Sequence, residues 1–188
     1  MNRCSWSGTK ENMIKYHDEE WGVPTHDDQK LFEFFVLDAF QAGLSWATIL
    51  NKRKNFRIAF DNYDLKKIQN YNERKIDELM NNAGIIRNKL KILSTIVNAK
   101  RFQEVQKEFG TFDKYIWSFV AGKTKINKWT EDDCILSTSI ESDLMSKDLK
   151  KRGFKFVGST IGYSFMQAAG MVNDHQISCF RYKVVNEL

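Results

Sequence analysis

Apolar residues recur at helical spacing, three and four positions apart, along most of this chain. Residues that favour helix N-caps precede several of these stretches: Asp64, Asn72, Thr111 and Ser142. Glycines that favour helix ends follow two others, at Gly84 and Gly153. The pattern predicts an all-α fold with helices over 11–20, 28–42, 44–60, 64–70, 72–82, 88–109, 111–121, 142–152 and 158–170, and a short last turn around 174–181.

One predicted helix carries an acid on its apolar side. At i, i+3, i+4 and i+7 spacing, the residues that share a face with Asp38 are Leu31, Phe34, Phe35 and Ala42. Burying a carboxylate costs free energy unless the group is paired or neutralised. Asp38 is therefore a candidate for a functional role.

Composition limits the classes of protein to be considered. The chain has 188 residues, of which 42% are hydrophobic, and we expect a single domain over 1–188. No apolar run approaches the ~20 residues of a membrane span, and the first residues lack the apolar core of a signal peptide, so we expect a cytoplasmic protein. The net charge of +5 favours an anionic partner, most commonly nucleic acid.

Four of the cysteines and histidines form two spaced pairs. Cys4 and His17 have twelve residues between them, and His175 and Cys179 have three, as in an i, i+4 pair on a helical turn. Two thiolates and two imidazoles form a closed tetrahedral set that suits a structural Zn²⁺ and would join the two ends of the chain. The alternative is that these are ordinary buried cysteines and histidines. Cys134 and His26 are left over, and we interpret both as structural or surface residues.

Residues 149–170 have the composition of a phosphate-binding hairpin. A basic helix end, 150–152, is followed by the Gly-bounded turn GFKFVG, which includes Lys155, and then by a new helix. The backbone N–H groups at the start of that helix would face an anion. These groups belong to Gly158, Ser159 and Thr160. The alternative is an ordinary connection between two helices with a solvated basic face.

Aromatic residues lie on both sides of Asp38 in the sequence: Trp6, Tyr16, Trp21 and Trp46. Aromatic walls around one carboxylate suit the recognition of a flipped base, by stacking on its faces and accepting a hydrogen bond from its edge. These rings could equally belong to the core. Gly43 and Leu44, at a helix junction, could present an apolar wedge to the gap that a flipped nucleotide leaves.

Several longer stretches resemble the 3-methyladenine DNA glycosylase I family of bacterial alkylation repair. They are RCSW, YHDEEWGVP, QAGLSWATIL, AGIIRNK, KKRGFKFVGSTIGYSFMQAAG and VNDH…C, in that order from Arg3 to Cys179. The resemblance implies a helix-hairpin-helix fold of two helical lobes, with a zinc ion held by Cys4, His17, His175 and Cys179. It also implies that the hairpin GFKFVG binds a phosphate of the DNA backbone.

The same resemblance assigns the base pocket and reveals two departures. The pocket falls on Tyr16, Trp46 and position 38, with Trp6 and Trp21 nearby and the wedge at Gly43 and Leu44. The family's usual acid is a glutamate, whereas this chain has Asp38, which is shorter by about 1.5 Å. A pocket tyrosine of the family is replaced by Met13.

The resulting hypothesis is a monomeric, monofunctional glycosylase that excises 3-methyladenine from double-stranded DNA and leaves an abasic site. Asp38 would accept a hydrogen bond from the base, and no lysine is placed to act as a Schiff-base nucleophile. Asp174 is a rival carboxylate, for which we favour a structural role. The alternatives are a non-catalytic lesion- or DNA-binding module on the same scaffold, and a zinc hydrolase, which a full set of four protein ligands opposes.

Overall fold

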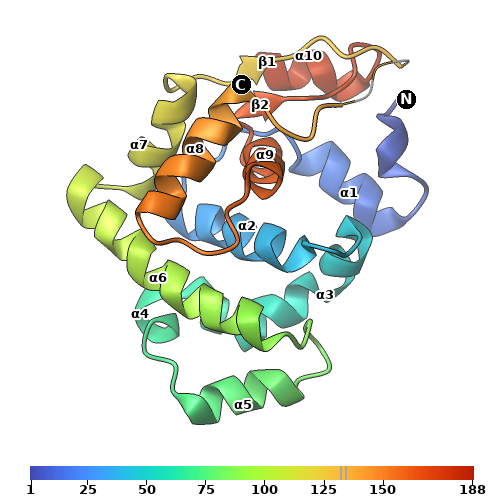
Figure 1. The fold of residues 1–188 in the computed structure, drawn as a ribbon. Helices are drawn as coiled ribbons and strands as arrows, with labels where there is room; N and C mark the ends of the chain where they lie inside the picture. Colours follow the sequence, from blue (N-terminus) through green and yellow to red (C-terminus); the bar gives the residue numbers. More distant parts are fainter. Residues whose placement is uncertain (132, 134) are drawn as a thin grey trace.

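The computed structural model describes residues 1–131, 133 and 135–188, and this part of the chain is mainly helical (Figure 1). Its helices and short 3-10 helices (η) are η1 (Ser5–Ser7), α1 (Glu11–Glu19), α2 (Asp28–Gln41), α3 (Trp46–Ala59), η2 (Asp61–Tyr63), α4 (Leu65–Ile68), α5 (Glu73–Asn81), α6 (Lys89–Phe109), α7 (Phe112–Trp117), η3 (Ser118–Val120), α8 (Ile140–Lys151), α9 (Ser159–Ala168) and α10 (Phe180–Asn186). Two short strands, β1 (Lys125–Ile126) and β2 (Val172–Asn173), pair in parallel.

Helix α2 lies at the centre of the molecule, between α3 and α6 on one side and α9 on the other (Figure 1). Every residue from Leu31 to Phe40 is buried. A helix that is covered on all sides needs apolar residues around its whole circumference, which explains the nearly continuous apolar run in this segment. Asp38 is one of the two acids in the run, and Glu33 is the other.

Helices α8 and α9 pack against each other and are joined by the turn 152–158. Gly153, at φ 86°, ends α8, and the Phe154 N–H donates to the Leu149 carbonyl at 3.0 Å. Helix α6 supports the turn through Asn98, whose side chain accepts from the Lys155 N–H at 2.8 Å and donates to its carbonyl at 3.0 Å.

The two ends of the chain lie on the same side of the molecule, at the top of Figure 1. The Phe180 N–H donates to the Asn2 carbonyl at 3.0 Å, so residues at the start of α10 contact the N-terminal segment directly.

The predicted helices are present from α1 to α9, with ends that differ by a few residues. Two details of the prediction are wrong. Helix α8 begins at Ile140 with Ser139 as its N-cap, and Ser142 completes the capping box from within the helix. The last helix begins only after Cys179, so His175 and Cys179 lie in the non-helical segment before it and not on a helical face. Cys134 lies outside the described residues, and His26 is a surface residue that pairs with Asp113 at 2.7 Å.

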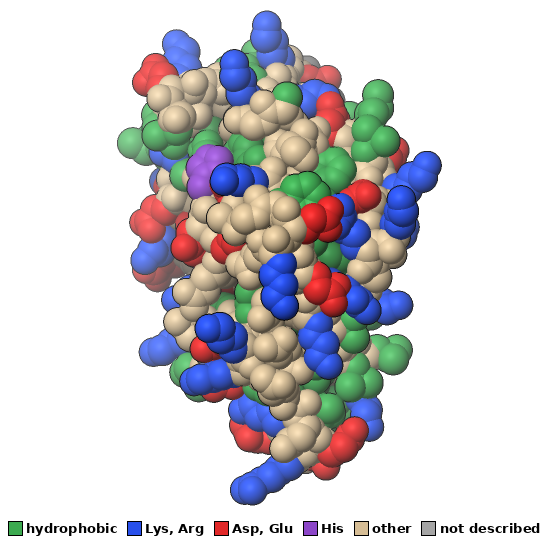
Figure 2. Space-filling model, turned by 90° about the vertical axis from the view of Figure 1, so that its left-hand side faces the viewer, with side chains coloured by type: hydrophobic (Ala, Val, Ile, Leu, Met, Phe, Trp, Pro, Cys, Tyr) green, Lys and Arg blue, Asp and Glu red, His purple; other side chains and the backbone are tan. Residues whose placement is uncertain are grey.

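Charged side chains are mixed on the side of the molecule that lies to the left in Figure 1. Figure 2 shows Lys and Arg interspersed with Asp and Glu over this face, without a single basic patch. The excess positive charge is therefore not concentrated on this face. Among the described residues, the structure has no helix with the length and hydropathy required to span a bilayer.

Candidate functional site: an aromatic cavity beside a Cys/His cluster

A cavity of about 270 Å³ brings the predicted base-pocket residues together. Its walls come from the N-terminal segment, α1, α2, α3, α9 and the segment that follows β1. The lining residues are Trp6, Tyr16, Trp21, Asp38, Gln41, Trp46, Ile135, Ser164 and Gln167. Helices distant in sequence thus converge on the face of α2 that carries Asp38.

Asp38 is only 3% exposed, and its Oδ2 atom has no hydrogen-bond partner among the described residues. Burial raises the pKa of this carboxyl well above its usual range, while the charge of Arg53 acts in the opposite direction. The wall of the cavity thus includes a buried carboxyl group with an oxygen that has no hydrogen-bond partner among the described residues.

The aromatic walls are rigidly packed against one another. The rings of Tyr16 and Trp46 have centroids 5.2 Å apart, and those of Trp6 and Trp21 are 4.7 Å apart in an edge-to-face arrangement. The buried indole N–H groups of Trp6 and Trp46 have no acceptor within the described part of the chain. The pKa of Tyr16 is raised well above its ordinary value, mainly by burial and secondly by the charge of the nearby Asp38, so its hydroxyl stays protonated. Met13 does not line the cavity.

The four predicted metal ligands form a buried cluster next to this cavity. Their ligand atoms, from Cys4, His17, His175 and Cys179, all lie within 4.8 Å of one another. The Cys179 Sγ atom is 3.5 Å from His17 Nε2 and 3.6 Å from His175 Nδ1. A closed set of two sulfur and two nitrogen donors has the composition of a structural metal site.

The other nitrogen of each histidine is held by an oxygen acceptor. His17 Nδ1 lies 2.7 Å from Asp18 Oδ1, and His175 Nε2 lies 3.0 Å from the Trp21 carbonyl. Arg3 in turn holds Asp18 through contacts of 2.8 to 3.0 Å. Such contacts orient ligating imidazoles in metal sites, so the residues present fit a bound metal ion.

The predicted wedge residues lie in the turn between α2 and α3. Gly43 has φ 80°, and the Leu44 side chain is 40% exposed. Lys91 of α6 is buried, and its Nζ donates to the carbonyls of Phe40 at 2.9 Å and Ala42 at 2.7 Å. Burial lowers the pKa of Lys91. This lysine fixes the end of α2 immediately before the turn.

The predicted phosphate-binding residues cluster at the N-terminus of α9. Gly158 is the N-cap residue, and no side chain among the described residues caps this end. Lys155 and Thr160 are exposed, whereas the Ser159 hydroxyl lies 2.8 Å from that of Ser142. The charge of Arg152 is not free for a phosphate, because its guanidinium pairs with Asp148 and Glu108, both at 2.7 Å.

Comparison with known proteins identifies the family. The family model described as methyladenine glycosylase matches residues 6–182.

The chain belongs to the methyladenine glycosylase family.

Its relatives in this family match it over nearly their whole length. DNA-3-methyladenine glycosylase 1 of Escherichia coli K12 is 45% identical over 182 residues, 97% of each protein. A crystal structure of a 3-methyladenine DNA glycosylase I superposes with a TM-score of 0.92 at 46% identity, covering 95% of this chain and 98% of the other. A tyrosine-to-phenylalanine variant of such an enzyme, crystallised with 3-methyladenine, gives 0.93 at 31% identity, covering 97% and 98%.

Several residues of this glycosylase-family cavity were not predicted from the sequence: Gln41, Ile135, Ser164 and Gln167. Gln41 lies three residues after Asp38, so helical spacing alone could have indicated it. Ile135 lies outside the predicted helices, and helical spacing does not distinguish Ser164 and Gln167 from their neighbours in the predicted helix 158–170. The rival acid Asp174 does not line the cavity; it is buried and accepts four hydrogen bonds.

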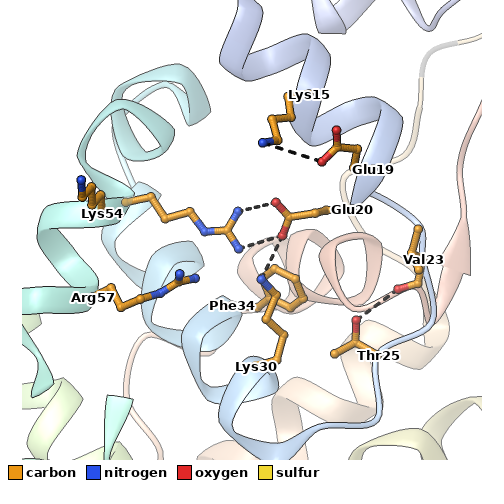
Figure 3. A pocket seen from close by; sticks show the side chains of 10 residues that line it. Lys15, Glu19, Glu20, Val23, Thr25, Lys30, Phe34, Lys54 and Arg57 are labelled. Carbon is orange, nitrogen blue, oxygen red and sulfur yellow. Dashed lines mark hydrogen bonds and ion pairs between the residues drawn. The ribbon is translucent and has the colours of Figure 1, made fainter. Parts of the chain in front are cut away.

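A larger groove of about 780 Å³ lies between α1, α2 and α3 (Figure 3). Several of its charges are paired with one another: Arg53 contacts Glu20 through two bonds of 2.8 Å, and Lys30 contacts Glu20 at 3.0 Å. Beneath them, burial would raise the pKa of Glu33, but Arg53 overcomes it and lowers the pKa to about 2. With a single aromatic ring, from Phe34, this groove lacks the walls that the smaller cavity offers to a base.

Proposed function

We propose that this member of the methyladenine glycosylase family hydrolyses the N-glycosidic bond of 3-methyladenine in alkylated DNA, releases the base and leaves an abasic site. The observation that carries the proposal is the aromatic cavity lined by Asp38, whose buried carboxyl group has an oxygen without a hydrogen-bond partner among the described residues. A flipped base needs stacking surfaces and a polar contact at its edge, and the cavity offers both. Relatives named for this activity support the substrate.

The charge of the lesion suits the cavity. 3-Methyladenine in DNA is a cation, so the base is already a good leaving group, and catalysis consists mainly of extrusion and electrostatic stabilisation. Desolvation by burial disfavours the anionic form of the Asp38 carboxyl. A cationic base that enters beside it supplies the missing opposite charge, which favours the carboxylate and a charge-assisted hydrogen bond from the base.

In this proposal Tyr16 and Trp46 shape and stack the base, with Trp6 and Trp21 as the outer walls. No lysine lines the described cavity, so we expect attack by water at the sugar carbon and no Schiff-base chemistry or strand cleavage. Asp38 is the catalytic residue proposed here, because its carboxyl group belongs to the wall of the cavity.

We further propose that the hairpin and the wedge hold the DNA. The exposed N–H groups at the start of α9, at Gly158, Ser159 and Thr160, would bind a phosphate, together with Lys155. Gly43 and Leu44 would fill the gap left by the flipped nucleotide. Helices α8 and α9, with the turn between them, would then act as a helix-hairpin-helix element on double-stranded DNA.

The Cys/His cluster is proposed to bind one structural Zn²⁺ per chain through Cys4, His17, His175 and Cys179. With all four positions filled by protein, the ion would fix the fold next to the cavity and would take no part in the reaction.

The deciding experiment is base release from methylated DNA, with chromatographic identification of the released base. We expect free 3-methyladenine and abasic sites without strand breaks. Asp38→Asn should lower the single-turnover rate about 10- to 100-fold, the value of one hydrogen bond to a charged group. Binding to an abasic-site analogue without base release would instead favour a lesion-binding module, and an unchanged rate in Asp38→Asn would exclude the proposed role of Asp38.

A further inference from the structure

One side chain of the cavity is oriented by a buried acid behind the wall. Gln167, on α9, lines the cavity, and its Nε2 donates to Asp174 Oδ2 at 2.7 Å. Asp174 is 1% exposed and accepts three further hydrogen bonds at 2.6 to 2.8 Å. These come from the side chains of Asn127, Trp129 and Tyr163. Asp174 thus forms a fixed anchor for the Gln167 amide.

This anchor determines which end of the amide is free. The oxygen and nitrogen of a glutamine side chain are otherwise interchangeable, and the hydrogen-bond network must decide between them. A carboxylate oxygen can only accept hydrogen bonds, and Asp174 Oδ2 already accepts one from the Tyr163 hydroxyl. The Gln167 NH₂ group, which donates, must therefore face it. The carbonyl oxygen of Gln167 is then the end left over, and it has no hydrogen-bond partner among the described residues.

Two residues that line the cavity therefore carry acceptors without hydrogen-bond partners in the described part of the chain: Gln167, through Oε1, and Asp38, through its buried carboxyl group. A 6-aminopurine carries two N–H bonds on one exocyclic nitrogen, and both need acceptors once the base leaves water. We infer that Gln167 is a specificity-determining residue, which accepts a hydrogen bond from the exocyclic amine of the adenine base while Asp174 fixes its orientation. The inference rests on the proposed function, since it names how the same cavity selects its base.

The same arrangement opposes guanine. A guanine derivative presents a carbonyl oxygen at the position of the adenine amine. That oxygen would face the acceptor oxygen of Gln167, which cannot rotate without breaking its bond to Asp174. An anchored amide thus rejects the wrong base by repulsion as well as by a missing bond.

A second glutamine in the same cavity provides a matched control. Gln41 also lines the cavity, but no hydrogen bond within the described residues fixes its amide. It can present either its oxygen or its nitrogen, so it should contribute little to the choice between an amine and a carbonyl. Gln167→Met and Gln41→Met remove the same functional group from the two positions at nearly constant volume.

The primary test is binding of free bases, measured by quenching of the fluorescence of the cavity tryptophans. The probes are 3-methyladenine and its 6-oxo analogue, 3-methylhypoxanthine. We expect Gln167→Met to weaken 3-methyladenine binding about 10-fold or more and to change the affinity for the 6-oxo analogue less than about 3-fold. Gln41→Met should keep the wild-type preference. Equal weakening of both probes by Gln167→Met, or none for 3-methyladenine, would overturn the inference.

Base release from methylated DNA distinguishes this inference from the proposed function. If Gln167 acts as inferred, Gln167→Met should lower the rate of 3-methyladenine release, and its selectivity over 3-methylguanine should fall. Wild-type protein that prefers free 3-methyladenine but releases no base would refute the proposed function and leave the role of Gln167 intact. Release of 3-methyladenine at the wild-type rate and selectivity by Gln167→Met would refute the role of Gln167 alone.

Discussion

At the scale of single residues, the buried carboxyl group of Asp38 lowers the free energy of unfolding at neutral pH. Its carboxyl group is buried with one oxygen unpaired within the described residues, and burial raises its pKa well above the usual range. The folded chain therefore holds this proton more tightly than the unfolded chain, whose aspartates titrate near pH ~3.9. The stabilising contribution is present below that pH and is lost as the pH rises towards the raised pKa.

Asp38→Asn should therefore be about as stable as the wild type near pH 4 and more stable at pH 7 to 8. We expect a gain in the free energy of unfolding of about 1–3 kcal/mol, the cost of an uncompensated buried polar group. Urea denaturation across this pH range measures it, and Asp77→Asn, at an exposed helical aspartate, is the control that should show no such trend. A stability difference that does not change between pH 4 and 8 would contradict the raised pKa.

At the scale of elements, α6 fixes both parts of the molecule proposed to contact DNA. Its Lys91 holds the end of α2 before the wedge turn, and its Asn98 holds the backbone of Lys155 in the hairpin. The spacing between wedge and hairpin is thus set by one helix, which extends from Lys89 to Phe109.

Removing the charge of Lys91 tests this arrangement. Lys91→Met leaves the carbonyls of Phe40 and Ala42 without the donors they have now, so we expect a loss of about 1–3 kcal/mol in the free energy of unfolding. Lys89→Met, on the same helix at an exposed position, should change it by less than about 0.5 kcal/mol. Thermal and urea denaturation of both variants provide the comparison. Similar stabilities of the two variants would show that the Lys91 contacts contribute nothing.

The connection after α9 depends on a glycine for two separate reasons. Gly170 has φ 71°, and a Cβ there would lie 2.3 Å from the Val23 carbonyl carbon and 2.4 Å from the Pro24 nitrogen. Gly122 has nearly the same backbone angle, φ 72°, but a Cβ there would meet no described atom within 4 Å. The pair separates backbone strain from steric overlap.

We therefore expect Gly122→Ala to cost about 1 kcal/mol of folding free energy, the penalty for a left-handed alanine. Gly170→Ala should cost about 3 kcal/mol or more, because backbone atoms must move as well. Soluble yield and denaturation midpoints measure both effects. Equal losses of folding free energy in the two variants would mean that the backbone of 23–24 moves to accommodate the extra methyl group at no cost.

The helices were largely predictable because periodicity and N-caps are local signals. Asp64, Asn72 and Thr111 cap the helices that they were expected to begin. Two serines three residues apart made α8 ambiguous, since both take part in its capping box. The anchoring of Gln167 by Asp174 was not predictable, because the donors to Asp174 come from two separate segments, 127–129 and α9, that only the fold brings together.

At the scale of the whole molecule, the Cys/His cluster joins the N-terminal segment to the turn before α10. If it binds a metal ion as proposed, metal content should be near one zinc per chain, and chelation should lower the melting temperature and activity together. Elemental analysis and thermal denaturation with a chelator measure both. Much less than one metal per chain in active protein would contradict the site.

The ligands themselves can be tested against a matched histidine. His175→Ala should reduce metal content and destabilise the protein by several kcal/mol, because it opens a buried cluster. His26→Ala, at a surface pair with Asp113, should leave metal content unchanged and cost less than about 1 kcal/mol. Full metal content in His175→Ala would remove this residue from the ligand set.

The cluster also sets an order of events during protein synthesis. Tyr16 of the cavity wall is adjacent to His17 in the chain, and the carbonyl of Trp21, another wall residue, contacts His175. The ribosome makes these parts of the wall first, and their partners His175 and Cys179 follow much later in the chain. A nascent chain halted before them contains Asp38 and all the cavity tryptophans but lacks the contacts that hold two of its walls. We therefore expect base excision only after His175 and Cys179 have been synthesised and have joined the cluster.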